Sequence, residues 1–215
     1  MQEINKTDLN SNKGLSLVEL LMAMAASLII LAAVYSVFTI TSKNFTTQNV
    51  AASTQQNLRA AIGLMARDIR LAGLDPSNSG SFGFSYASSA KIRFTLDSVD
   101  SGSGDFNGTV DEYNFEQISY EFQDGQIMQT LYEDTGSEDS VSLIGNIIVA
   151  EFRYLDGANS DLIDTGLTPP RVPTDQLEDI RTVEIEMTIQ EPAGRDEPVS
   201  RTLTRRIECR NMAYN

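Results

Sequence analysis

A single carboxylate, that of Glu19, lies inside the longest apolar stretch of the chain. The stretch runs from Leu15 to Ile40, contains no Pro or Gly, and has Glu19 as its only charge. As a helix rising 1.5 Å per residue it would span roughly 39 Å, enough to cross a bilayer with some tilt. A lone carboxylate in lipid costs about 3 kcal/mol. We therefore expect Glu19 to serve a function and to have a partner of opposite charge.

A second group of residues that could do chemistry is the acidic loop between residues 97 and 112. Its oxygen-bearing side chains suit a hard cation, and Asn107-Gly108 after Asp105 partly matches a calcium loop, although the full EF-hand spacing is absent. The candidate calcium ligands are Asp100, Asp105, Asn107 and Asp111. The competing interpretation is a solvated acidic loop that needs no metal or other cofactor.

The whole composition limits the possible functions. The chain has 215 residues, a net charge of −14, no His and one Cys, Cys209. Without His the commonest general base and metal ligand is missing, and no nucleophile motif stands out, so we expect no enzyme. An acidic surface argues against binding nucleic acid through its phosphates. A single Cys allows no internal disulfide, so the domain must be held by packing.

The segment before the apolar run supplies the context for Glu19. Residues 1–14 are polar, their side chains sum to zero charge, and they end at Lys13-Gly14. With Glu19 five residues after Gly14, the arrangement closely resembles the class III signal of type IV prepilins. In that family a prepilin peptidase cuts after the Gly and the new N-terminal amine is methylated. The resemblance implies cleavage between Gly14 and Leu15, methylation of Leu15, and a subunit-pairing role for Glu19. Leu at the first mature position departs from the commoner Phe.

Two other interpretations of this segment remain open. One is an ordinary secretory signal peptide cut near Ala25-Ala26, although the apolar run continues well past that point. The other is a plain membrane anchor in which Glu19 is incidental.

The helix is predicted to continue beyond the membrane. Residues 41–56 are polar but free of Pro and Gly, and a single apolar stripe follows at helical spacing. Gly73 is the expected C-cap and Pro76 follows shortly. The stripe consists of Leu58, Ile62, Met65 and Ile69. We predict one helix from about Leu15 to Ala72.

Alternating apolar residues and turn signals predict strands after the helix. Residues 75–89 and 157–179 are expected to be loops, Asp124-Gly125 a hairpin turn, and residues 203–207 an edge strand. Strands are expected over 91–97, 118–122, 127–132, the later part of 140–155, and 183–189. The fold class is thus α+β, a long N-terminal helix packed on a mostly antiparallel sheet domain. The predicted parts are a leader (1–14), a transmembrane part (15–40), an amphipathic part (41–74) and an extracytoplasmic β-rich domain (75–215).

Further resemblances refine the family. The helix end over residues 64–73, Ile118-Ser119-Tyr120 before the hairpin, and residues 206–211 resemble PilW-type minor pilins and the J-type minor pseudopilins of type II secretion. The resemblance implies a low-copy subunit at or near the filament tip that helps initiate assembly. Arg67, Asp68 and Arg70 are either an interface pair with another minor pilin or charges satisfied within the domain.

The implied partners are prepilin peptidase, other minor and major pilins, the inner-membrane assembly platform and the membrane itself, with no nucleic acid. The implied location is the inner membrane, with the domain outside the cytoplasm, and then the extracellular pilus. The alternatives are a minor pseudopilin of a type II secretion system and, from another class, a bitopic membrane protein with an extracytoplasmic ligand-binding or adhesive domain.

Overall fold

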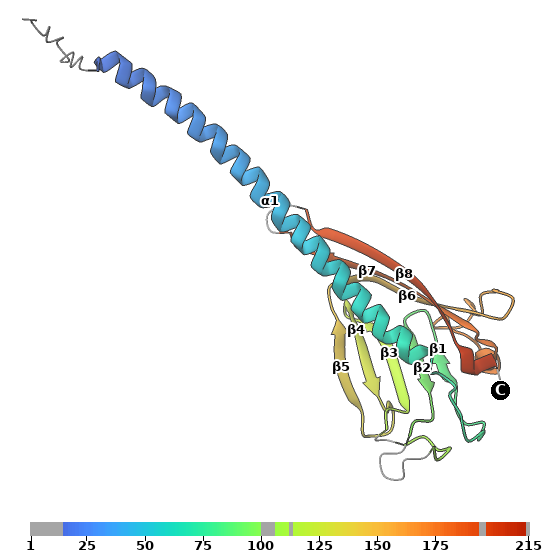
Figure 1. Ribbon diagram of the computed structural model, residues 1–215. Helices are drawn as coiled ribbons and strands as arrows, with labels where there is room; N and C mark the ends of the chain where they lie inside the picture. The colour runs from blue at the N-terminus through green and yellow to red at the C-terminus, as the bar shows by residue number, and fades with distance from the viewer. Residues whose placement is uncertain (1–14, 100–105, 112–113, 194–196, 214–215) are drawn as a thin grey trace, which may run out of the picture. The chain divides into compact units, whose positions relative to one another are not determined.

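One long helix and two antiparallel sheets make up the fold, seen in a computed structural model that describes residues 15–99, 106–111, 114–193 and 197–213. The chain divides into two compact units, Met1–Thr46 and Thr47–Asn215. The helix α1 runs from Leu17 to Ile69, and the described strands follow it in the second unit (Figure 1). This order of a long helix and then antiparallel strands confirms the predicted α+β class.

The helix α1 extends almost as far as the apolar pattern predicts. All four residues of the predicted stripe are buried: Leu58, Ile62, Met65 and Ile69. After the helix, Gly73 adopts a left-handed φ of 72°, and its N–H donates to the Thr95 carbonyl at 3.0 Å. A Cβ at Gly73 would lie 2.6 Å from the Met212 sulfur. Both its conformation and its close packing therefore require a glycine where the chain leaves the helix.

The first sheet has five antiparallel strands in chain order. They are β1 (Phe84–Ala87), β2 (Lys91–Thr95), β3 (Gln117–Gln123), β4 (Gln126–Leu131) and β5 (Asp139–Ile144). The predicted hairpin at Asp124-Gly125 joins β3 to β4, and both residues have positive φ, 51° and 73°. Two successive positive φ values are the geometry of the turns that match strand twist in tight hairpins. The hairpin prediction is confirmed.

Strand β1 corrects the prediction that residues 75–89 form only a loop. Phe84 pairs with Phe94 of β2, and the register shifts between Phe84 and Tyr86. The two phenylalanine rings also meet edge to face, with centroids 6.1 Å apart. The surrounding Ser and Gly residues hide so short a strand in the sequence, and pairing with β2 is what makes it a strand.

The apolar segment 140–155 forms two strands rather than one strand preceded by a turn. Strand β5 ends at Ile144, and β6 (Ile147–Leu155) begins after Gly145 and Asn146. Asn146 has a positive φ of 57°. The break therefore directs the chain out of the first sheet and into the second. The prediction of a turn before a single strand was wrong, because Gly145-Asn146 separates two strands that both contribute side chains to the same core.

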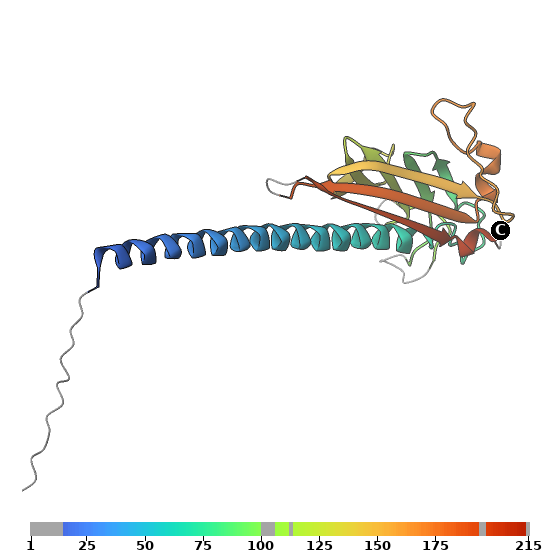
Figure 2. The same cartoon turned by 90° about the horizontal axis from the view of Figure 1, so that it is seen from above.

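The second sheet has three antiparallel strands in the order β6, β7 (Thr182–Glu191) and β8 (Val199–Glu208), which run side by side in Figure 2. The four alternating residues predicted for β7 are all buried: Val183, Ile185, Met187 and Ile189. Strand β8 pairs only with β7 among the described strands, as predicted for an edge strand. The predicted loop 157–179 contains a short 3-10 helix at Thr174–Asp179.

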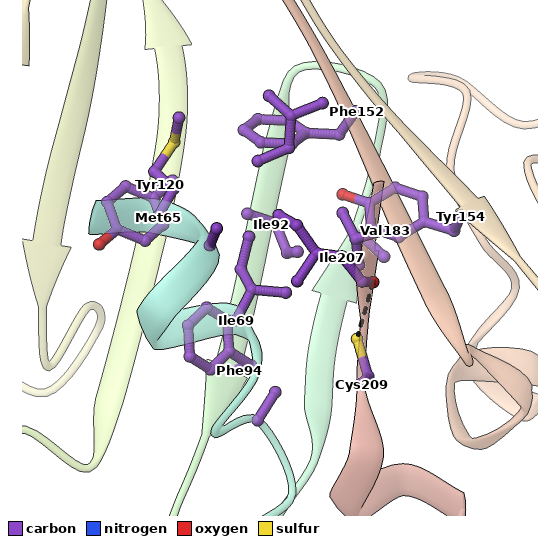
Figure 3. Close-up of a cluster of buried hydrophobic side chains, with 14 of the residues drawn as sticks. Met65, Ile69, Ile92, Phe94, Tyr120, Phe152, Tyr154, Val183, Ile207 and Cys209 are labelled. Atoms are coloured by element: carbon purple, nitrogen blue, oxygen red, sulfur yellow. Dashed lines mark hydrogen bonds between the residues drawn. The ribbon is translucent and has the colours of Figure 1, made fainter. Parts of the chain in front are cut away.

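A single apolar core joins the second half of α1 to both sheets. Figure 3 shows Met65 and Ile69 of the helix facing Ile92 and Phe94 of β2, with side chains from the second sheet beyond them. Tyr154, Val183, Ile207 and Cys209 complete that part of the cluster. The helix therefore holds the two sheets together, because its stripe contacts a core to which both contribute.

Candidate functional site

Glu19 lies in the first turn of α1, where its carboxylate caps the helix. Its Oε2 accepts a hydrogen bond from the backbone N–H of Ser16 at 3.3 Å. In return the Ser16 Oγ accepts one from the N–H of Val18 at 3.3 Å. This reciprocal arrangement is a variant of the capping box, in which the Ser16 hydroxyl bonds the second helical N–H instead of the third, and it satisfies N–H groups that have no partner within a helix. A negative charge in the first turn also interacts favourably with the helix dipole.

Ser16 is a site residue that the sequence interpretation missed. Its spacing from Glu19, with two residues between them and an apolar run after them, is the sequence signature of a capping box. The cap matters because it holds the Glu19 carboxylate against the backbone of Ser16, next to Leu15. The Leu15 nitrogen is one peptide unit from the Ser16 nitrogen that Glu19 already contacts. An amine created at Leu15 would thus form close to this carboxylate.

The proposed cleavage point itself is only half described. Leu15 is described and exposed, whereas Gly14 and the rest of the leader lie outside the described residues. Cleavage between Gly14 and Leu15, and methylation of Leu15, therefore stay predictions. The geometry of Ser16 and Glu19 is compatible with both.

The helix surface that follows Glu19 is apolar and open. Its large side chains are exposed from Leu15 through Ile40, and it is long and apolar enough to cross a membrane. Two hydroxyl groups in this part bond back to the helix: Ser27 Oγ donates to the Ala23 carbonyl at 2.7 Å and Thr39 Oγ1 to the Ser36 carbonyl at 2.8 Å. Such bonds satisfy polar groups where water cannot. Among these residues Glu19 carries the one formal charge.

Asp68 is buried, with 6% of its surface exposed, and fastens the helix to the first sheet. Its Oδ2 accepts a hydrogen bond from the Tyr120 hydroxyl at 2.7 Å, and its Oδ1 one from Arg67 Nε at 3.0 Å. Gln129 Nε2 donates to the same Tyr120 oxygen at 2.9 Å. Burial, followed by the nearby Asp68 charge, raises the pKa of Tyr120 well above its usual range. Of the two interpretations of Asp68, an interface pair or a charge satisfied within the domain, the structure supports the second.

The acidic loop is less solvated at its base than its composition suggests. Asp97 and Glu116 are both 0% exposed. Glu116 accepts hydrogen bonds from the backbone N–H groups of Ser98 at 3.0 Å and Asp111 at 2.6 Å. Asp97 Oδ2 accepts from Ser77 Oγ and from the Gly108 N–H, each at 3.2 Å, whereas Asp97 Oδ1 is buried without a hydrogen-bond partner. The sequence interpretation did not single out these two carboxylates.

Of the four predicted calcium ligands, Asn107 and Asp111 come together and the other two cannot be placed. Asn107 Nδ2 donates to Asp111 Oδ2 at 2.5 Å. Asn107 Oδ1 is occupied as well, because it accepts from the Thr109 N–H at 2.8 Å. Asp100 and Asp105 lie outside the described residues. Within the described part of the chain no group of three or more potential metal ligands is found.

Cys209 lies in the core with 2% of its surface exposed, and its Sγ is 3.9 Å from the Ile207 carbonyl oxygen, drawn as a dashed line in Figure 3. Burial raises the pKa of its thiol to about 12. A thiol that ionises so reluctantly is a poor nucleophile. Cys209 is therefore a packing residue.

Comparison with known proteins identifies the start of the chain. Residues 9–35 match the family model described as the prokaryotic N-terminal methylation motif, which is the prepilin signal of type IV pilin-like proteins. The match contains Gly14, Leu15, Ser16 and Glu19. No curated protein matches the chain. The methylation motif and the capping box thus coincide at the N-terminus of α1.

Proposed function

We propose that this chain is a minor pilin that helps initiate and assemble type IV pili at or near the filament tip. The observation that carries the proposal is the methylation motif over residues 9–35, which ends in an apolar helix capped by Ser16 and Glu19. In this proposal prepilin peptidase cuts between Gly14 and Leu15, and Leu15 is methylated. The β-rich domain then lies outside the cytoplasm, and the mature chain joins other minor and major pilins through the assembly platform of the inner membrane.

Glu19 would drive this assembly by charge pairing. Among the described residues Glu19 forms no ion pair, and its carboxylate accepts a hydrogen bond only from the uncharged Ser16 N–H. Moving into a bundle of helices, it can meet the Leu15 amine of a neighbouring subunit, which neutralises both charges and fixes the axial register. Buried pairs of this kind contribute specificity more reliably than stability. Methylation keeps the amine positive and makes it more apolar.

The minor, tip-directed role rests on the resemblance to PilW-type pilins over the helix end and the C-terminal residues. In this chain the two segments lie together, because Asn211 Nδ2 donates to the Arg70 carbonyl at 3.3 Å.

The experiment is complementation of a strain that lacks this gene and has few or no pili. Wild-type protein should restore the number of pili per cell, whereas Glu19→Ala should restore few, although the protein is cleaved and held in the membrane. The matched control is Ser27→Ala, which removes a polar group from the same helix without removing charge. Normal pilus numbers with Glu19→Ala incorporated into filaments would overturn the pairing mechanism.

The same deletion strain distinguishes the minor pilin from the two alternative functions. A minor pseudopilin of a type II secretion system would leave pili unchanged and reduce the secretion of folded exoproteins. A bitopic membrane protein with a ligand-binding or adhesive domain would retain residues 1–14 and leave both assemblies intact. No described residue favours catalysis, and the proposal includes no enzymatic activity.

Calcium binding is a further part of this proposal, and Asp97 supports it. Asn107 and Asp111 satisfy each other, whereas Asp97 Oδ1 is, among the described residues near the loop, a buried oxygen without a hydrogen-bond partner. A hard cation held by both oxygens of Asp97 would supply the missing partner. The proposal includes no other cofactor.

A further inference from the structure

A tripeptide in the acidic loop has the sequence of an acceptor for sugars. Asn107-Gly108-Thr109 follows the pattern Asn-x-Thr, which marks sites of N-linked glycosylation on the surface loops of exported proteins. Both Asn107 and Thr109 are exposed. Neither the processing of the N-terminus nor the packing of the core uses these two side chains, so they are free for another role.

The side chain of Asn107 is folded back onto Thr109. Its Oδ1 accepts a hydrogen bond from the Thr109 N–H at 2.8 Å and a second one from the Thr109 hydroxyl at 3.0 Å. The first bond forms an Asx turn, in which the side chain takes the place of a backbone carbonyl. The hydroxyl that defines the acceptor pattern thus contacts the amide directly. Because the oxygen is held in this way, the amide nitrogen is left as the reactive end.

The amide nitrogen of Asn107 is oriented but not saturated. Nδ2 carries two N–H groups, one of which donates to Asp111 Oδ2 at 2.5 Å. No acceptor for the second N–H is found among the described residues. The exposed nitrogen can therefore be reached by a sugar donor without breaking a bond in the core.

Two buried carboxylates hold this turn in place. Asp97 Oδ2 accepts from the Gly108 N–H at 3.2 Å, and Glu116 Oε2 accepts from the Asp111 N–H at 2.6 Å. Both carboxylates are 0% exposed. Gly108 has a left-handed φ of 72°, and a Cβ there would lie 2.6 Å from the Ser77 hydroxyl oxygen, so a glycine is required. The fold thus presents the acceptor in one conformation, which lowers the entropy cost of binding it to an enzyme.

The same pattern occurs twice more in the chain without these features. Residues 44–46 lie within α1, where the Thr46 hydroxyl donates to the Ser42 carbonyl at 3.1 Å. That hydroxyl is therefore used by the helix, and a helical backbone does not form an Asx turn. Residues 5–7 lie in the leader, which is removed in the proposed processing. Among the three, the geometry favours Asn107.

Apolar side chains on both sides of the acceptor are exposed. Phe106 has 42% of its surface exposed and Val110 has 40%. Contact between such side chains and water is unfavourable. A sugar ring has an apolar face of C–H groups, and a glycan that begins at Asn107 starts between these two residues in the chain. It would therefore shield apolar surface that the fold leaves open.

We propose that Asn107 is N-glycosylated, with a lipid-linked oligosaccharide as the donor. In this reaction Nδ2 attacks the anomeric carbon of a sugar carried on a polyprenyl pyrophosphate. The C–N bond forms as the C–O bond to the pyrophosphate breaks, the lipid pyrophosphate leaves, and one amide proton passes to a base of the transferase. The proposal rests on the proposed function for one point only, the location of the domain outside the cytoplasm.

The test is mass spectrometry of the full-length mature chain, purified in detergent from its own cells. We expect a mass above that of the methylated chain by a whole number of sugar residues, which electron-transfer fragmentation assigns to Asn107. Asn107→Gln and Thr109→Ala should abolish this increment, whereas Thr109→Ser should retain it because the hydroxyl is kept. Asn114→Gln is the matched control, since Asn114 is in the same loop but has Glu116 two positions later. It should retain the sugar.

The outcomes separate this site from the proposed function. Thermal unfolding shows that each variant is folded. An Asn107 without sugar in the wild-type chain, or sugar on Asn44 and none on Asn107, would overturn the glycosylation site. A chain that starts at Leu15 and supports pili but carries no sugar would keep the proposed function and overturn the site. Sugar on Asn107 of a chain that retains residues 1–14 and does not affect pili would keep the site and overturn the minor-pilin function.

Discussion

The hydroxyl of Tyr120 on β3 lies 2.7 Å from Oδ2 of Asp68 on α1, and both side chains are buried. The bond joins residues 52 positions apart and connects the helix to the first sheet through a polar contact inside an otherwise apolar core. Gln129 on β4 donates to the same hydroxyl, so three elements meet at one phenolic oxygen.

Tyr120→Phe should destabilise the domain by about 1–3 kcal/mol, because it leaves a buried carboxylate oxygen and a donor on Gln129 unpaired. Urea unfolding of the full-length protein in detergent, followed by near-ultraviolet circular dichroism, measures the change. Asp68→Asn combined with Tyr120→Phe should cost less than the sum of the two single changes. Tyr86→Phe is the control, since no described hydrogen bond uses that hydroxyl, and it should be nearly neutral. Strict additivity of Asp68→Asn and Tyr120→Phe would argue against the coupling.

Processing is tested by the mass of the mature chain. The motif over residues 9–35 predicts a protein that starts at Leu15 and carries one added methyl group. Replacing Gly14 with a bulky residue should leave residues 1–14 attached and prevent incorporation into filaments. A mature chain that begins after Ala25 or Ala26 would instead identify a secretory signal peptide.

Variants of Ser16 and Glu19 separate helix capping from charge pairing. Glu19→Gln keeps a side chain that can accept the Ser16 N–H bond, because Gln also serves at this position of a capping box. It cannot neutralise an ammonium group, so we expect pilus numbers almost as low as with Glu19→Ala. Ser16→Ala removes the side-chain cap at a cost of about 1 kcal/mol to the helix, and pilus numbers should stay near the wild-type value. Equal defects in Ser16→Ala and Glu19→Gln would show that the cap, and not the charge, is what assembly needs.

Calcium should raise the melting temperature of the full-length protein in detergent, since a ligand that binds only the folded state stabilises it. Differential scanning with and without millimolar calcium measures the shift. Asp97→Asn should abolish it, because it removes the charge of the carboxylate that has the unpaired oxygen. Asp105→Ala tests the loop residue that the sequence favoured, and magnesium serves as the control ion. No shift in the wild-type protein would leave the loop as an acidic surface without a metal.

Cys209 should react slowly with iodoacetamide at pH 8 in the folded protein and rapidly after unfolding. Burial raises its thiol pKa to about 12, so the thiolate fraction at pH 8 is far below that of an exposed cysteine. Because thiolate is the reacting species, the rate should rise with pH up to that value. Mass spectrometry of the alkylated protein follows the reaction. Fast labelling without unfolding would place Cys209 at the surface.

The N-terminal part of the site can be predicted from the sequence because it depends only on residues that are close together in the chain. Apolar length, the absence of Pro and Gly, and the position of Glu19 relative to Gly14 predict a membrane-length helix and a processing signal without any distant contact. The capping box of Ser16 and Glu19 is equally local, and its spacing could have been recognised. The hairpin at Asp124-Gly125 and the buried face of β7 are predictable for the same reason, since turn chemistry and alternation act over a few residues.

Only the tertiary structure decides which distant residues meet. From the sequence, Asp68 is expected to be a surface charge, because it lies among arginines on a helix. Only the fold shows that the Tyr120 hydroxyl donates a hydrogen bond to it. Asp97 belongs to a loop that the sequence predicts to be acidic and exposed, and nothing in the sequence singles out Glu116, yet the fold buries both carboxylates. The break between β5 and β6 and the pairing of β1 depend on strands elsewhere in the chain.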